Sequence, residues 1–415
     1  MKRILPAVLP IIIVTLVWVL APSANAASKL ESLYKFYDYL KGDNPVAGLT
    51  YDSAGNLYGT TKYGGGAGDI FELTPNSDGT WTESVIHTLS GLQGENPVAA
   101  LTLDSAGNLY GTTQYGGTDH GAAGVVFELT PNRDGTWTDN VLYDFCSLSK
   151  CTDGSNPMSN VIFDQNGNLY GTTSLGGPSD GGLVYKLAPN GSGGWTESVI
   201  YSFTTGRDGG TPVAGVIFDK AGNLYGTTVE NGLGWGTVFE LSPNQDGGWS
   251  ESTLYRFCHL ENCRDGGQPF GALTLDAAGN LYGTTEDLGA YGYGNVFELT
   301  PTTKGPWNEK VLHQFTGGDD GANPYGGVTF DSTGKLYGTT YSGGGSSSCN
   351  GGCGIVFKLV PGSNGVWHED TIYAFNGFFK GSPEAGLVFN GSNFYGTTSR
   401  ASNGHGFGSV FEVIP

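Results

Sequence analysis

The sequence is poor in positive charge and in long apolar runs. Its 415 residues include only 19 lysines and arginines against 39 aspartates and glutamates, a formal net charge of −20. Such a surface repels the phosphates of nucleic acids and anionic lipids, so a nucleic-acid partner is excluded. The one long apolar run lies at the N-terminus, and beyond it we expect no contact with a membrane.

That N-terminal run has the form of a secretory signal peptide. Lys2 and Arg3 precede it, and Ala24-Asn25-Ala26 is typical of a cleavage site. Its uninterrupted part, residues 11–20, is short for a membrane span, although an uncleaved anchor is the alternative. We expect residues 1–26 to be removed, which leaves 17 basic against 39 acidic side chains, a net charge of −22. The product would be a secreted or periplasmic monomer.

Cysteine is scarce, and the six cysteines fall into close pairs. In an exported protein such pairs predict disulfides that pin short loops. A metal site is the alternative, but no companion histidine or second cysteine pair stands at a metal-binding spacing. The pairs are Cys146 and Cys151, Cys258 and Cys263, and Cys349 and Cys353.

The usual catalytic motifs are missing. The sequence has no His-Glu-x-x-His, no Gly-x-Ser-x-Gly and no P-loop. Among the histidines, only His120, beside Asp119, is a candidate for acid–base chemistry. We therefore assign no catalytic residue from the sequence.

What the sequence has in abundance is glycine, 71 residues, and one repeated unit. Gly55-Asn56-Leu57-Tyr58-Gly59-Thr60-Thr61 returns with small changes six more times, at spacings of 52 to 60 residues. A repeat of this length decides the fold before any local motif. The tyrosines of the seven copies are Tyr58, Tyr110, Tyr170, Tyr225, Tyr282, Tyr337 and Tyr395.

Each repeat predicts four short strands. In the first repeat these are residues 46–52, 56–61, 69–74 and 81–89, bounded by Gly, Asn, Asp and Pro. Four antiparallel strands in a repeat of this length are typical of a β-propeller blade.

The two ends of the chain predict how the propeller closes. Residues 31–36 resemble a fourth strand, whereas residues 410–415 resemble a third strand with no fourth after it. The N-terminal strand would therefore complete the last blade and leave no open sheet edge. We predict an all-β fold, one seven-bladed propeller over residues 27–415.

Residues that recur in every blade are interpreted as scaffold. Asp52 and its equivalents would accept hydrogen bonds from a turn, and Glu72 and its equivalents would lie on a solvated face. Gly59 would admit a bulky group from the adjacent blade. The tryptophans that open six of the fourth strands would pack between blades; they are Trp81, Trp137, Trp195, Trp249, Trp307 and Trp367.

Function is expected where the blades differ, because an active or binding centre is asymmetric. The loops from strand four to the next strand one, and from strand two to three, share one rim and carry the cysteines, the longest Gly-rich insertions, carboxylates and aromatic residues. These groups suit a carbohydrate or protein ligand, or a calcium ion, although turn chemistry is the alternative. The candidate ligand-binding residues are Asp153, Asp208, Asp265, Asp320, Tyr63, Tyr115 and Trp235.

The repeated unit Gly-Asn-Leu-Tyr-Gly-Thr-Thr, followed by Val-Phe-Glu-Leu-Thr-Pro, resembles the GloVer (Gloeo-Verruco) tandem-repeat family of exported bacterial proteins. The resemblance implies a secreted propeller but brings no defined activity. Members of that family often carry a C-terminal surface anchor. The sequence shows none after Pro415, so a freely soluble protein is expected. Two functions remain: a non-catalytic binding module without a required cofactor, or a polysaccharide lyase or hydrolase with acidic residues at the propeller mouth.

Overall fold

A computed structural model describes residues 28–38, 42–118, 123–230, 234–303, 306–377, 381–399 and 407–415. The predicted signal peptide, residues 1–26, lies outside these ranges. Within them, no helix has the length and apolar character needed to cross a membrane. Within these ranges the helical structure consists of two short 3-10 turns, η2 (Ser149–Cys151) and η3 (Glu261–Cys263).

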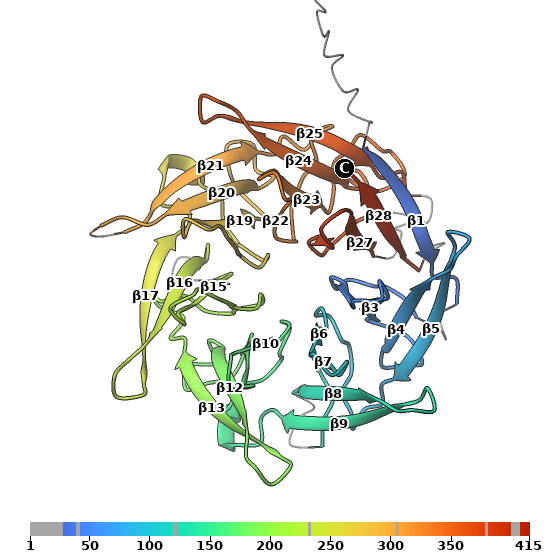
Figure 1. The fold of residues 1–415 in the computed structure, drawn as a ribbon. Helices are drawn as coiled ribbons and strands as arrows, with labels where there is room; N and C mark the ends of the chain where they lie inside the picture. Colours follow the sequence, from blue (N-terminus) through green and yellow to red (C-terminus); the bar gives the residue numbers. More distant parts are fainter. Residues whose placement is uncertain are drawn as a thin grey trace, which may run out of the picture.

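The strands form seven four-stranded antiparallel sheets arranged as blades around a central axis (Figure 1). Within blades 1 to 6 the strand order follows the sequence, so each blade is a meander. The prediction of an all-β, seven-bladed propeller is confirmed.

The strand bounds are as follows. Blade 1 has β2 (Thr50–Tyr51), β3 (Leu57–Thr61), β4 (Asp69–Pro75) and β5 (Trp81–Thr88). Blade 2 has β6 (Thr102–Leu103), β7 (Leu109–Thr113), β8 (Val125–Pro131) and β9 (Trp137–Asp144). Blade 3 has β10 (Ile162–Phe163), β11 (Leu169–Thr173), β12 (Leu183–Pro189) and β13 (Trp195–Ser202). Blade 4 has β14 (Ile217–Phe218), β15 (Leu224–Thr228), β16 (Thr237–Pro243) and β17 (Trp249–Arg256).

Blade 5 has β18 (Thr274–Leu275), β19 (Leu281–Thr285), β20 (Asn295–Thr300) and β21 (Asn308–Gln314). Blade 6 has β22 (Thr329–Phe330), β23 (Leu336–Thr340), β24 (Ile355–Pro361) and β25 (Trp367–Ala374). Blade 7 has β26 (Val388–Phe389), β27 (Phe394–Thr398), β28 (Ser409–Ile414) and, from the other end of the chain, β1 (Lys29–Lys35).

The ring closes through blade 7, as predicted. β1 pairs antiparallel with β28, with Lys29 opposite Ile414 and Lys35 opposite Ser409 (Figure 1). The last described strand of the chain thus gains its outer neighbour from the first one. Because β1 covers the outer edge of β28, β28 has a paired strand on both sides.

The conserved glycine of the repeat motif makes room for an aromatic ring. A Cβ at Gly59 would lie 2.5 Å from Cζ of Phe71, which stands on β4 of the same blade. Phe71 is 1% exposed, so the glycine permits the ring to fill the core of its blade. The prediction that the bulky group comes from the adjacent blade was therefore wrong; it comes from strand three of the glycine's own blade.

The first strand of each blade is shorter than predicted. In blade 1 only Thr50 and Tyr51 pair with β3, whereas residues 46–52 were expected to form the strand. The residues before the strand, which line the central channel, bond to the neighbouring blade instead. For example, the Ala47 carbonyl accepts a hydrogen bond from the Thr397 hydroxyl of blade 7.

The tryptophans pack between blades, as predicted. The indole of Trp249 in blade 4 meets the ring of Tyr170 in blade 3 edge to face, with centroids 6.2 Å apart. Trp137 meets Tyr58 in the same way across the joint between blades 1 and 2. Each core cluster therefore combines side chains of two neighbouring blades, as where Trp249 packs beside Tyr170 and Phe239.

Candidate functional site

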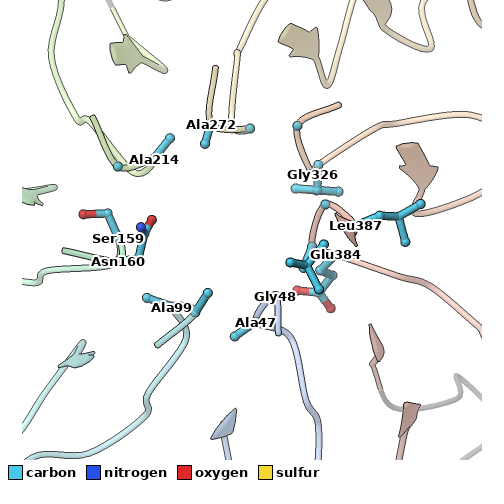
Figure 2. Close-up of a pocket in the computed structure, with 18 of the residues that line it drawn as sticks. Ala47, Gly48, Ala99, Ser159, Asn160, Ala214, Ala272, Gly326, Glu384 and Leu387 are labelled. Carbon is cyan, nitrogen blue, oxygen red and sulfur yellow. The ribbon is translucent and has the colours of Figure 1, made fainter. Parts of the chain in front are cut away.

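The central channel is a cavity of about 520 Å³ lined in all seven blades by the residues before the first strand, and in blades 1, 5, 6 and 7 also by residues of that strand. Most side chains of its wall are small, for example those of Ala47, Ala99 and Ala214, because one segment from each of the seven blades converges on the axis (Figure 2). Ser159 and Asn160 of blade 3 give one side of the wall polar groups, and Glu384 lies on the other side (Figure 2). The channel is thus asymmetric in its polar groups.

Two positions in each blade form the rim of this channel, and we call them together the mouth ring. One follows the proline that precedes the first strand, and the other follows the second threonine of the repeat motif. In every blade a backbone hydrogen bond joins the second position to the residue just before that proline, as where the Lys62 N–H donates to the Asn44 carbonyl. The first set is Val46, Val98, Met158, Val213, Phe270, Tyr325 and Glu384. The second set is Lys62, Gln114, Ser174, Val229, Glu286, Tyr341 and Ser399.

The residues just before the prolines also join neighbouring blades. The residue before each proline donates its N–H to a carbonyl in the two-three loop of the preceding blade, as from Asn96 to Ala67. Equivalent bonds occur at all seven joints and include that from Asn44 to Phe407, which closes the ring. Each mouth-ring side chain therefore lies beside backbone that is bonded within its own blade and to the preceding one.

The side chains of the mouth ring differ from blade to blade. In blades 5 and 6, Tyr325 lies between two other rings, with its centroid 5.3 Å from Phe270 and 5.3 Å from Tyr341. Tyr341 is 38% exposed, whereas Phe270 and Tyr325 are half-buried. Three aromatic side chains thus form a continuous surface at one side of the mouth.

A carboxylate lies against this aromatic surface. The hydroxyl of Tyr325 hydrogen-bonds the carboxylate of Glu286, which stands in blade 5. Burial raises the pKa of Glu286, and the charge of Asp287 adds to the effect, although the bond from Tyr325 opposes it. Burial and the neighbouring Glu286 also raise the pKa of Tyr325, so its hydroxyl remains a proton donor at neutral pH.

A second carboxylate stands in blade 7. Burial raises the pKa of Glu384, while the nearby hydroxyl of Ser399 and the charge of Lys62 in blade 1 partly offset the effect. Glu384 also acts electrostatically on Tyr325. Two carboxyls with raised pKa values therefore flank the aromatic surface, and Lys62 is the basic side chain nearest to Glu384 in the mouth ring.

The opposite side of the mouth is mostly apolar. Blades 3 and 4 contribute Met158, Val213 and Val229 to the mouth ring. The amide of Gln114 in blade 2 approaches the Met158 sulfur at 3.7 Å. The mouth thus has an aromatic and charged arc in blades 5 to 7 and an apolar arc facing it.

Two of the predicted ligand-binding residues lie next to the mouth ring. Tyr63 and Tyr115 each follow a mouth-ring residue, and their exposed fractions are 37% and 38%. Each forms a β-bridge with the residue two before the proline, Asp43 and Glu95 respectively. They lie on the mouth face of blades 1 and 2, whereas the main aromatic surface lies in blades 5 and 6.

The four predicted aspartates lie at separate joints and are not brought together. Asp153 and Asp265 are fully buried, and each accepts hydrogen bonds from the tyrosine at the end of strand four and from loop N–H groups. At Asp265 these donors are the Tyr255 hydroxyl at 2.9 Å and the His259 N–H at 2.8 Å. These contacts tie the loop to the outer strand of its blade.

The other two aspartates make similar bonds. Asp208 accepts from the Tyr201 hydroxyl and the Thr204 N–H, and Asp320 accepts from the Thr316 N–H. Burial raises the pKa of Asp208, but the bonds from Thr204 outweigh it and the pKa lies below its usual range. The oxygens of all four carboxylates are thus engaged by loops, as the turn interpretation proposed.

Trp235 lies in the two-three loop of blade 4. Its carbonyl accepts from the Gln268 N–H of blade 5, and its ring packs against the cluster of Phe257 and Leu273. Trp235 thus joins blades 4 and 5. The predicted disulfides are confirmed, with all three pairs formed and no free cysteine.

The repeated polar residues behave as scaffold. Asp52 accepts from the Ala54 and Asn56 N–H groups and from the Asn56 amide, as predicted for a turn. Glu72 is half-buried and accepts from the Tyr58 hydroxyl at 3.0 Å. Its face is thus less solvated than expected, and its carboxylate supports the repeat tyrosine.

No group of three or more His, Cys, Asp or Glu side chains within the described ranges is arranged to hold a metal ion. The candidate acid–base pair of Asp119 and His120 lies outside the described residues. The chemistry that the site can supply therefore comes from the tyrosines and carboxyls of the mouth ring.

Comparison by sequence identifies the family of the chain. A family model described as the Gloeobacter/Verrucomicrobia repeat matches residues 19–161 and 124–349. The chain belongs to this repeat family. Among curated proteins, none matches the chain. The resemblance stated from the motif is thus confirmed over most of the sequence.

Comparison by structure finds other propeller-like chains at low identity. A putative 6-phosphogluconolactonase from Bacteroides uniformis aligns with a TM-score of 0.54 at 12% identity, covering 84% of this chain and 89% of that one. A luciferin-regenerating enzyme aligns with a TM-score of 0.44 at 13% identity, covering 94% and 96%. At 12% identity the first likeness shows the fold alone.

The sequence reasoning missed most of the mouth ring. Phe270, Glu286, Tyr325, Tyr341 and Glu384 were not among the candidates. A signal was present, because aligning the seven copies of the repeat shows these two positions varying between apolar, aromatic and charged residues beside invariant Pro and Thr-Thr. We expected the functional variation between blades to lie within the loops, whereas these variable residues stand where the loops meet the strands.

Proposed function

We propose that this propeller is a secreted, non-catalytic binding module that takes a carbohydrate at the mouth of its channel. The observation that carries the proposal is the surface of Phe270, Tyr325 and Tyr341, flanked by the carboxyls of Glu286 and Glu384. Aromatic faces stack on the apolar faces of sugar rings, and carboxylates accept hydrogen bonds from sugar hydroxyls.

The scaffold supports this proposal through its rigidity. Every mouth-ring residue is flanked by backbone bonds within its blade and to the preceding one. A site on such backbone is organised before the ligand arrives, which lowers the entropic cost of binding. Disulfides in three of the rim loops suit an extracellular setting, and with residues 1–26 as a signal peptide they support secretion.

A polysaccharide lyase or hydrolase is the second candidate. Glu286 and Glu384 both have pKa values above the ordinary range, which is the property required of a carboxyl acting as a general acid. The tyrosine between them keeps its proton because its own pKa is raised. This arrangement would supply proton donors on two sides of a bound sugar.

A glycan array with the purified protein tests the proposal, followed by analysis of the glycans that bind. Retention of intact glycans supports the binding module. Release of unsaturated or new reducing ends would favour the enzyme, provided that Glu286→Gln or Glu384→Gln abolishes release without abolishing binding. The absence of any glycan bound above the background of a Tyr325→Ala variant would refute a carbohydrate site at the mouth.

A further inference from the structure

At six of the seven joints between blades, a tryptophan fills the same place. The indole that opens the fourth strand of one blade packs against the repeat-motif tyrosine of the blade before it. The pairs are Trp81 with Tyr395, Trp137 with Tyr58, Trp249 with Tyr170, Trp307 with Tyr225 and Trp367 with Tyr282, with centroids 6.1 to 6.5 Å apart. Trp195 packs against the cluster that contains Tyr110.

Among the described residues, the seventh joint, between blades 6 and 7, has no such tryptophan. The fourth strand of blade 7 is β1, in which Lys29 lies opposite Ile414. Continuing that register puts Ser28 opposite Pro415, in the place where Trp249 lies opposite Pro243 in blade 4. Serine thus stands where the other blades have tryptophan.

A cavity of about 440 Å³ lies at this joint, and we call it the Ser28 slot. A matching cavity of about 520 Å³ lies beside Trp249 at the joint between blades 3 and 4, so the cavity itself is shared; what differs here is that Ser28 leaves free the part of the wall that the indole occupies there. It is lined by Ser28, Tyr337, Phe389 and Pro415, together with a few polar side chains. Phe394, which replaces the leucine of the repeat motif, stacks on Tyr337 at 4.1 Å. The core side of the joint is therefore packed, while the space beside Ser28 stays open.

The same joint departs from the repeat in its charges. Lys335 lines the slot where the other six blades have asparagine, and Lys358 lines it where five blades have glutamate. Lys358 Nζ lies 3.1 Å from a carboxylate oxygen of Asp370. Asp331 also lines the slot, but its carboxylate accepts from the Thr333 and Lys335 N–H groups of its own turn. Compared with blade 2, Lys335 and Lys358 replace Asn108 and Glu128 at the wall, while Asp370, where blade 2 has Asn140, adds a negative charge beside Lys358.

We infer that the Ser28 slot binds a ring-shaped carboxylate, with the ring in the place of the absent indole and the carboxylate at the two lysines. The space accepts an indole at six other joints, so a ring of that size fits beside Tyr337. Ammonium groups at its wall favour an anion in a protein that is otherwise strongly acidic. Hydroxyls of Ser28, Thr333 and Ser392 at the wall can bond the substituents of the ring. This site is separate from the channel mouth.

Calorimetric titration of the purified protein tests the inference with three probes. Indole-3-acetate represents an aromatic carboxylate, glucuronate represents a uronic acid, and tryptamine is the cationic counterpart of the first. We expect one of the two anions to bind, and tryptamine to bind at least about tenfold more weakly than indole-3-acetate if the ring is aromatic. The anion that binds shows whether the ring of the ligand is aromatic or that of a uronic acid. If neither binds at millimolar concentration, the inference is wrong.

Two sets of variants locate the site. Ser28→Trp should fill the slot, raise the melting temperature and abolish binding, whereas Lys29→Trp, on the exposed neighbour in β1, should do neither. Lys335→Asn with Lys358→Glu restores residues that the other blades carry, so folding should be retained while anion affinity falls about tenfold or more. Unchanged binding in Ser28→Trp, or in the lysine variant if Ser28→Trp does not fold, would overturn the assignment.

Discussion

The hydroxyl of Thr397 donates a 2.8 Å hydrogen bond to the carbonyl oxygen of Ala47, across 350 residues of chain. Thr397 stands in the repeat motif of blade 7 and Ala47 in the channel wall of blade 1. The first threonine of the motif makes the same kind of bond at other joints, as from Thr284 to Gly326 and from Thr339 to Ala385. The repeat motif therefore carries the contact between blades, and its last copy closes the ring.

We predict that Thr397→Val lowers the free energy of unfolding by about 1–2 kcal/mol, because it leaves a buried carbonyl without its donor. Thr227→Val is the matched control. The Thr227 hydroxyl is buried without a hydrogen-bond partner among the described residues, so its replacement should be neutral or stabilising. Urea unfolding of both variants measures the difference. Equal losses in the two variants would show that the bond to Ala47 contributes nothing.

The tryptophan joints give a second prediction. Trp249→Ala removes an indole that packs on Tyr170, and it should cost about 3 kcal/mol, the lower end for tryptophan because the side chain is only half-buried. Val366→Ala, at an exposed residue in a turn, is the control and should cost little. The measurement is again urea unfolding. A loss no larger than that of the control would mean that the joint does not depend on the indole.

Most of the fold could be predicted from the sequence because the same four-strand pattern occurs in seven copies of the repeat. The offset between residues 31–36 and residues 410–415 fixed the closure and the blade count. The error at Gly59 has a physical reason, because a strand pattern shows that space is required but does not show which ring fills it. Phe71 occupies that space through the register of β3 and β4, which places it directly opposite Gly59.

The site could be predicted only in part. Tyr63 and Tyr115 were predicted because aromatic residues in loops are conspicuous, and their role in binding stays a prediction. Tyr325 and Glu286 could not be paired from sequence, since they stand in different blades and meet only through the curvature of the ring. Asp153 and Asp265 have the composition of a ligand site, but burial and hydrogen-bond partners, which decide their role, are properties of the folded chain.

Stability should depend on pH through carboxyls between the outer strands. Burial, with the charge of a neighbouring aspartate, raises the pKa of Glu197 and of Glu309 to about 7, from an ordinary 4.5, and burial raises that of Glu369 to about 7 as well. The folded protein then holds protons that the unfolded chain has released, so this contribution is full below pH 4.5 and is lost as the pH rises through 7. We expect the melting temperature to fall by about 2 °C or more between pH 6.5 and 8.5.

Glu309→Gln is the control for that prediction, because the amide cannot titrate. It should reduce the fall between pH 6.5 and 8.5 while raising the melting temperature at the upper end. The window begins at pH 6.5 because burial lowers the pKa of His313, whose protonation in more acidic solution acts in the opposite direction. A melting temperature that rises with pH across this window would contradict the assignment to these carboxyls.

The disulfides should differ in their effect on stability. Cys349 and Cys353 are buried in a core cluster with Phe375, whereas Cys258 and Cys263 are half-buried. Closing so short a loop contributes about 2 kcal/mol in either case. Replacing Cys349 and Cys353 with serine also puts hydroxyls into the core, so this pair should cost more than replacing Cys258 and Cys263. Thermal unfolding of the two double variants decides, and equal losses would show that loop closure is the whole effect.

The channel mouth gives the last prediction. Tyr325→Ala removes the central ring between Phe270 and Tyr341, so binding of a glycan identified on the array should weaken by about tenfold or more. Tyr325→Phe keeps the ring but removes the bond to Glu286, so it should retain most of the affinity if stacking dominates. Val98→Ala, at the same mouth-ring position in blade 2, is the matched control and should bind as the wild type does. If Tyr325→Ala retains as much affinity as Val98→Ala and the wild type at equal melting temperatures, the ligand does not contact the aromatic arc, and its site must lie elsewhere.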